Sequence, residues 1–148
     1  MPSLWDPGAT DRMLARLERL TPDTKARWGR FSCPDMVAHL NESIRMALGE
    51  VTPASKKLPI RFFPLKQLII YVLPFPRSAP TAPELLVRSG RSVWADEVKM
   101  FRELLARLAA HSKSASWPPH PAFGTMNRRS WGVLGYKHCS HHFDQFGV

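Results

Sequence analysis

Apolar residues recur at helical spacing in four stretches of the chain, and no stretch alternates between apolar and polar positions as a strand does. The clearest stripe lies between residues 92 and 111, and its members are Trp94, Val98, Phe101, Leu105 and Leu108. Steps of three and four residues match the period of an α-helix and give it one inward face. We therefore expect a long helix with Ser92 as its N-cap that reaches about His111.

Two similar stripes predict long helices in the first third of the chain. One is expected from a cap at Thr10 to about Leu20. The other has Ser32 as its N-cap, because Asp35 follows three residues later in the pattern of a capping box. Gly49 is expected to end this second helix, since glycine readily takes the left-handed conformation that follows a helix.

The last helix is predicted from about Arg128 to Phe146, with Thr125 or Asn127 as its cap. Residues 50–89, between the second and third helices, follow no regular period, and only the segment 65–72 predicts a short helix. A connection of this length with apolar content should pack across the other helices. The pattern therefore predicts an all-α fold, a four-helix bundle with a long crossover after the second helix, in a single domain over residues 1–148.

The charge of the chain changes this picture little. A formal net charge of +9 is compatible with nucleic acid, a membrane surface or anionic small molecules as partners. The basic residues are spread along the chain, and the aromatic residues fall on the core stripes instead of alternating with Lys or Arg. We therefore expect neither a nucleic-acid nor a membrane partner, with nucleic-acid binding through the basic surface as the weaker alternative. The most apolar segment, residues 68–73, is far too short to span a bilayer.

Two cysteines, Cys33 and Cys139, are too few for a disulfide framework. The first residues lack the basic and apolar regions of a signal peptide, so the expected location is the cytoplasm. Cys33 falls in the first turn of the second helix, where the helix dipole can lower the pKa of a thiol. A small buried side chain is the favoured interpretation of Cys33.

The residues that indicate chemistry are concentrated near the end of the chain. Residues 131–147 hold three of the six histidines, and His138 and His142 lie four residues apart with Gln145 three further on. That spacing puts both imidazoles on one face of a helix. Most pairs of this kind lie at the surface or in a hydrogen-bonded core. Here the pair shares its face with apolar residues, and His39 lies beside the apolar stripe of the second helix.

Three imidazole nitrogens projecting from facing helices form a typical metal site of a helical bundle. Such a set leaves coordination positions open, as in catalytic zinc sites, and it also suits nickel, iron or copper. His141 is turned about 100° around the helix from His142. A solvent-facing position is favoured for His141 over a contact with the ligands. His111 and His120 are interpreted as structural.

A metal site of this kind benefits from a general base, and Glu42 is the candidate catalytic residue because it lies about one turn after His39. A solvent-exposed glutamate is the commoner alternative for such a position. Arg45 and Arg61 are candidates for contacts with an anion. Nothing in these residues selects the substrate.

Three segments carry a resemblance to a known family: PDMVAHLNESI around His39, HPAFG at residues 120–124, and WGVLGYKHCSHHFDQFG at residues 131–147. Together they resemble the DinB-like superfamily, and more narrowly a bacterial subfamily labelled as a domain of unknown function (1569). The resemblance implies an up-down-down-up four-helix bundle with a divalent metal on His39, His138 and His142. Gln145 matches a polar residue that commonly follows the histidine pair, whereas Asp144 departs from the pattern and has no assigned role.

Characterised members of the superfamily include a mycothiol-dependent isomerase and bacillithiol S-transferases, and homodimers are common among them. The resemblance therefore implies a divalent-metal-dependent enzyme, with zinc or nickel favoured and thiol-dependent S-transferase or hydrolase chemistry. Its implied partners are a low-molecular-weight thiol, a small-molecule substrate and a second copy of the chain. Anionic compounds are among the candidate substrates. The alternative is a non-catalytic bundle that binds small molecules or has a structural role.

Overall fold

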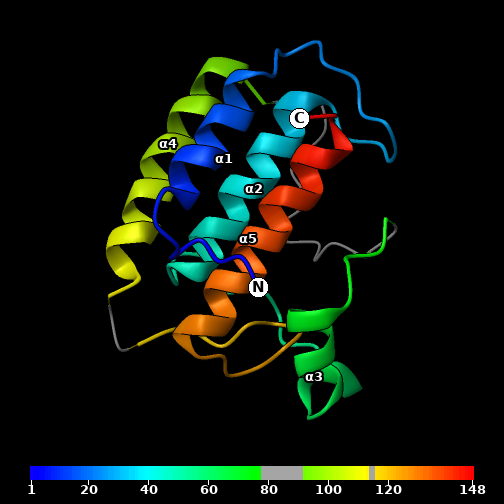
Figure 1. The fold of residues 1–148 in the computed structure, drawn as a ribbon, viewed down its shortest axis with the longest axis vertical. Helices are drawn as coiled ribbons and strands as arrows, with labels where there is room; N and C mark the ends of the chain where they lie inside the picture. Colours follow the sequence, from blue (N-terminus) through cyan, green and yellow to red (C-terminus); the bar gives the residue numbers. More distant parts are fainter. Residues whose placement is uncertain (78–91, 114–115) are drawn as a thin grey trace.

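The computed structural model describes residues 1–77, 92–113 and 116–148, and over these residues the chain is helical and contains no strand. The all-α prediction is therefore confirmed. The longer helices are α1 (Ala9–Glu18), α2 (Cys33–Ala47), α4 (Trp94–His111) and α5 (Arg128–Gln145). These helices lie side by side, with α2 and α4 running down the view and α1 and α5 running up it (Figure 1).

The two helices that carry the histidine motifs begin at caps that the sequence predicts. The Ser32 hydroxyl accepts a hydrogen bond from the backbone N–H of Asp35 at 3.2 Å. The Asn127 side chain accepts one from the N–H of Ser130 at 2.8 Å, so Asn127 and not Thr125 caps α5. Each cap satisfies a backbone donor that the helix itself leaves unpaired. The first turns of α2 and α5 are thereby fixed.

Two other helix starts differ from the prediction. Helix α1 begins at Ala9 after Gly8, whose φ of 70° is left-handed, and Thr10 lies inside the helix. Helix α4 begins at Trp94 after Val93, and no side chain caps it, so Ser92 is not the cap. The preceding turn starts α1 two residues earlier than a cap at Thr10 would, because the N–H of Ala9 already bonds to the carbonyl of Asp6 at 3.0 Å.

The core lies where the four longer helices meet. Helix α2 contacts α4 and α5, and α1 contacts the same two helices. The largest fully buried side chains come from all four helices and include Met13, Leu17, Met36, Leu40, Phe101, Leu105 and Phe143. Each such side chain contributes about 1.5–3 kcal/mol when it leaves water. This packing brings the inward faces of α2 and α5 together.

The crossover after α2 packs against α5. It contains η1 (Pro59–Arg61), α3 (Leu65–Gln67) and η2 (Leu68–Val72), and the last two form the short helix predicted over residues 65–72. The Lys137 ammonium on α5 donates hydrogen bonds of 2.6 Å to the carbonyls of Ile69 and Leu73. These bonds tie the end of η2 to α5. The remainder of the predicted crossover, residues 78–89, lies outside the described residues.

None of the helices in the described part of the chain combines the length and the apolar character that crossing a membrane requires.

Candidate metal centre

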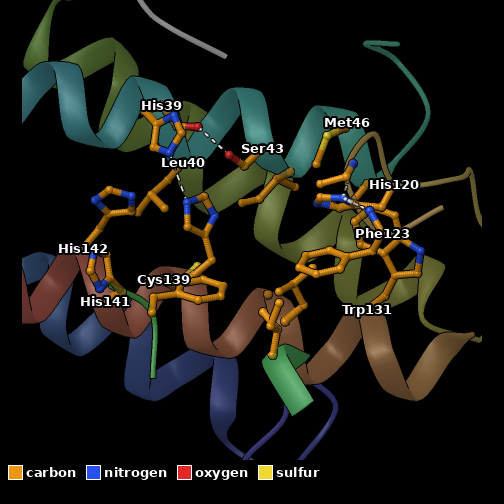
Figure 2. Close-up of a pocket in the computed structure, with 18 of the residues that line it drawn as sticks. His39, Leu40, Ser43, Met46, His120, Phe123, Trp131, Cys139, His141 and His142 are labelled. Carbon is orange, nitrogen blue, oxygen red and sulfur yellow. Dashed lines mark hydrogen bonds between the residues drawn. The ribbon is translucent and has the colours of Figure 1, made fainter. Parts of the chain in front are cut away.

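Three histidines from two helices converge on one point between α2 and α5. The ligand nitrogens of His39, His138 and His142 all lie within 4.8 Å of one another. Nε2 of His39 is 3.0 Å from Nε2 of His138. Figure 2 shows His39 on α2 facing the histidine side chains of α5. The three histidines predicted from the sequence are therefore close enough together to hold a metal ion.

The arrangement follows from local geometry and one additional aromatic ring. Residues His138 and His142 share a face of α5 because they are one turn apart. The ring of Phe31, just before α2, stacks on His39 with centroids 5.3 Å apart and meets His142 edge-on at 5.7 Å. Phe31 thus closes one side of the site and restricts the orientation of two ligand rings.

Gln145 determines which nitrogen of His142 can bind a metal. The Gln145 amide N–H donates to the carbonyl of Trp28 at 2.7 Å, which turns its oxygen toward His142. That oxygen lies 2.8 Å from Nδ1 of His142 and so accepts a hydrogen bond from the Nδ1–H group. A neutral imidazole with its proton on Nδ1 carries a lone pair on Nε2. A hydrogen bond of this kind commonly orients a metal-binding histidine.

Burial keeps the imidazoles of His138 and His142 neutral. Burial and then the nearby imidazoles of His142 and His39 lower the pKa of His138 well below its usual 6.5. Burial, followed by the nearby imidazole of His39, lowers the pKa of His142 to about 3 despite the hydrogen bond to Gln145. Neutral imidazole is the form that binds a metal. The described residues add no carboxylate to the group, and a set of nitrogen donors fits zinc or nickel.

A cavity of about 610 Å³ extends from the three histidines between α2 and α5. Most of its wall is apolar, and its charged side chains are Arg30, Lys56 and Arg77. Within the described ranges no Asp or Glu lines it. An apolar wall with only positive charges favours a largely apolar molecule that carries a negative or electron-rich group.

The structure does not bring Glu42 into this cavity. Its carboxylate binds Arg45 at 3.1 Å, three residues along α2, and Glu42 is not among the residues that line the cavity. Neither Arg45 nor Arg61 lines it, and Arg61 donates to the Ser55 hydroxyl at 2.7 Å. A catalytic role for Glu42 therefore stays a prediction. The positive charges at the cavity come from Arg30, Lys56 and Arg77 instead.

His141 lies closer to the site than the solvent-facing position favoured from the sequence. Its half-buried ring has its centroid 5.9 Å from that of Phe75 and 6.0 Å from that of Trp28, and it lines the cavity. Burial lowers its pKa. The reason for the difference is tertiary, because Phe75 comes from the crossover and Trp28 from the loop before α2.

The cysteines and Asp144 serve the fold in this structure. Cys33 and Cys139 are buried free thiols, and burial raises the pKa of each to about 12. Both thiols therefore stay protonated, which agrees with a packing role for Cys33. Asp144 is exposed and binds Arg16 of α1 at 2.6 Å. This ion pair joins α1 to the last turn of α5.

Several cavity residues come from segments without a helical pattern. Arg30 and Phe31 lie before α2, Phe75 follows η2, and His120 lies between α4 and α5. Hydrophobic periodicity cannot place such residues. A weak signal existed for His120 alone, because it opens the HPAFG segment that ends in a glycine.

Comparison with known proteins gives one match. No curated protein and no solved structure matches the chain. The family model described as "Protein of unknown function (DUF1569)" matches residues 6–147, which is nearly the whole chain and includes all three histidines of the candidate metal centre. The match carries no link to the DinB-like superfamily and no activity. The chain with this three-histidine centre therefore belongs to the DUF1569 family.

Proposed function

We propose that this chain is a divalent-metal-dependent enzyme in which His39, His138 and His142 hold zinc or nickel. The observation that carries the proposal is the convergence of three imidazoles at a largely apolar cavity, with one ring oriented by Gln145. Three nitrogen donors with a cavity beside them are typical of catalytic sites, which keep coordination positions open.

A divalent ion on three neutral ligands lowers the pKa of a thiol or a water molecule and so supplies a nucleophile. The protein itself provides the surroundings for that nucleophile. Apolar walls exclude water, and Arg30, Lys56 and Arg77 attract an anionic reactant. Thiol-dependent S-transfer with a low-molecular-weight thiol is the favoured chemistry, and hydrolysis is the second class. A base role for Glu42 requires its carboxylate to leave Arg45.

We also propose that the chain forms a single DinB-like four-helix bundle over residues 1–148. Two observations support this architecture. Helices α1 and α5 run opposite to α2 and α4 (Figure 1), and the crossover follows α2. This topology lets α2 and α5 lie side by side although residues 48–127 separate them in the sequence.

Elemental analysis of protein purified without a histidine tag tests the metal site. We expect near-stoichiometric zinc or nickel in the wild type and its loss in both His39→Ala and His138→Ala, because these ligands come from different helices. His111→Ala is the matched control, since His111 does not line the cavity. Absence of metal from the wild type after reconstitution with either ion and dialysis would contradict the proposal.

The second candidate is a non-catalytic binding module, which the size and apolar wall of the cavity favour. Consumption of a thiol with an electrophilic aryl halide distinguishes the two candidates. Metal-dependent release of halide supports the enzyme. Saturable binding of both reactants by the metal-loaded protein without halide release supports the module.

A further inference from the structure

The HPAFG segment holds one more histidine at the cavity, and its ring is fixed by backbone groups. Nδ1 of His120 accepts hydrogen bonds from the N–H groups of Ala122 at 3.1 Å and Phe123 at 3.3 Å. The backbones of His120 and Gly124 bond to each other in both directions, at 2.9 and 2.8 Å. Gly124 takes a left-handed φ of 66°, which closes this turn. The ring therefore has a defined orientation.

These bonds also fix the protonation of the ring. Because two N–H groups point at Nδ1, this nitrogen must carry the lone pair, and the proton of the neutral ring lies on Nε2. Burial, with a smaller effect from Lys66, lowers the pKa of His120 to about 4, so the ring is neutral near pH 7. Among the described residues, no group accepts a hydrogen bond from Nε2.

His120 lies at the other end of the cavity from the three metal-binding histidines. Figure 2 shows His120, Phe123 and Trp131 gathered at one side and His39 and His142 at the other. The ring of His120 packs on Trp131, with centroids 5.5 Å apart. Trp131 and His138 are seven residues apart on α5, which corresponds to about 10 Å along the helix axis.

The wall of the cavity is largely apolar, and of its three lining cations Lys56 lies at the end that holds His120. Leu40, Ile44 and Leu134 line the middle of the cavity. At the far end, the backbone N–H of Lys56 bonds to the carbonyl of Pro121 at 2.9 Å, which holds the Lys56 segment beside the turn. The ammonium of Lys66 bonds to the carbonyl of Thr125 close by.

We propose that His120 is a substrate-binding residue whose Nε2–H donates a hydrogen bond to a carboxylate on an elongated, otherwise apolar substrate. The substrate's reacting end lies at the three histidines, and the positive charges of Lys56 and Lys66 favour the carboxylate at the other end. The inference rests on the proposed function for the identity of the reacting end. It adds a substrate class, an apolar chain or ring system spanning about 10 Å between its two polar groups.

Matched thiols test the inference on the metal-loaded protein. The probes are mercaptooctanoate, with a thiol at one end and a carboxylate at the other, and octanethiol, which lacks the carboxylate. Trp117 and Trp131 line the cavity, so tryptophan fluorescence follows binding. A hydrogen bond to a charged group should make mercaptooctanoate bind about tenfold tighter than octanethiol.

The variant His120→Asn should remove this preference and leave the affinity for octanethiol unchanged. Asparagine can accept the same backbone N–H groups in an Asx turn, so the HPAFG turn is retained, but its side chain is too short to replace Nε2. His111→Asn serves as the control, and thermal unfolding confirms that both variants fold. A loosened turn would lower the affinity for both probes equally. Loss of the carboxylate contact would lower the affinity for mercaptooctanoate alone and so change the ratio of the two affinities.

A second probe pair, octanoate and octanol, separates failure of this inference from failure of the metal site. Protein treated with a chelator should still prefer octanoate to octanol, and His120→Asn should abolish that preference. If the affinity for the thiols does not depend on the metal but the preference for octanoate over octanol persists, the proposed function is contradicted and the His120 site is supported. Equal affinity of the wild type for mercaptooctanoate and octanethiol, or an unchanged ratio in His120→Asn, would overturn the inference.

Discussion

The two ends of the cavity each present a histidine, but the two rings carry opposite protonation patterns. At the metal end, Nδ1 of His142 donates to Gln145, which leaves a lone pair on Nε2. At the turn end, Nδ1 of His120 accepts from two backbone N–H groups, which leaves a proton on Nε2. One residue type therefore serves as a ligand at one end and a donor at the other. The group that is hydrogen-bonded to Nδ1 determines whether Nε2 is a metal ligand or a hydrogen-bond donor.

The two ends also differ in how they are built. The metal end uses two capped helices, and its donors repeat at a helical spacing. The turn end combines the HPAFG segment, the start of α5 and the residues after α2. A helical scaffold holds ligands at fixed spacing, which suits a metal ion. A turn that satisfies its own backbone through a side chain suits recognition of one substrate group.

The largest effect is expected at the metal end, where replacing His142 by alanine should differ from replacing the adjacent His141. Zinc at a thousandfold excess over its dissociation constant should stabilise the wild type and His141→Ala by about 4 kcal/mol, by mass action. His142→Ala should show no such gain, because it removes a ligand whereas His141 lies beside the site. Thermal unfolding with and without zinc measures the difference. A full zinc-dependent shift in His142→Ala would contradict the assignment.

Acid should destabilise the protein at both ends, because the pKa values of His138, His142 and His120 are all lowered, and the share of the turn end can be measured separately. The pKa of His120 is about 4 in the folded chain against 6.5 as the ordinary value, so only the unfolded chain takes up this proton between those values. Stability that is present above pH 6.5 is therefore lost as the pH falls toward 4, by up to about 3 kcal/mol. His120→Asn should show a correspondingly smaller loss in urea unfolding between about pH 7 and about pH 4. Parallel losses in both proteins would contradict the assignment of a neutral buried His120.

Removing the orienting partner of His142 should have a smaller effect on the metal. Gln145→Ala deletes the acceptor that holds the Nδ1 proton, and loss of such a partner typically costs tenfold to a hundredfold in metal affinity. Competition with a chromophoric chelator measures this affinity. Asp144→Ala is the control on the adjacent residue, because Asp144 is exposed and pairs with Arg16. Equal affinities for these two variants would show that Gln145 does not position the ligand.

The smallest effect is expected at Glu42. Its contact with Arg45 is a partly exposed pair within one helix, so Glu42→Gln should change the free energy of unfolding by less than about 0.5 kcal/mol. Turnover per bound metal should also stay unchanged, since Glu42 does not line the cavity. A large drop in turnover with normal metal content would instead establish Glu42 as a base that reaches the site during reaction.

Local signals predicted the elements of this fold well. The stripes and caps anticipated α2 and α5, including Ser32 and Asn127, because a cap involves residues only three apart. The caps of α1 and α4 were misassigned, because nearby polar residues offered a plausible cap that the chain does not use. Whether a serine caps a helix depends on the path of the chain before it, which periodicity does not contain.

By itself, the sequence determined that the chain is helical and that His138 and His142 share one face of a helix, since both follow from the geometry of a single turn. Tertiary structure decided the rest of the site. Packing of α2 on α5 brings His39 to the pair, Gln145 and the HPAFG backbone set two opposite protonation patterns, and Arg45 holds Glu42 outside the cavity. Helical spacing is local, but the protonation of a histidine depends on which atom the fold places beside its other nitrogen.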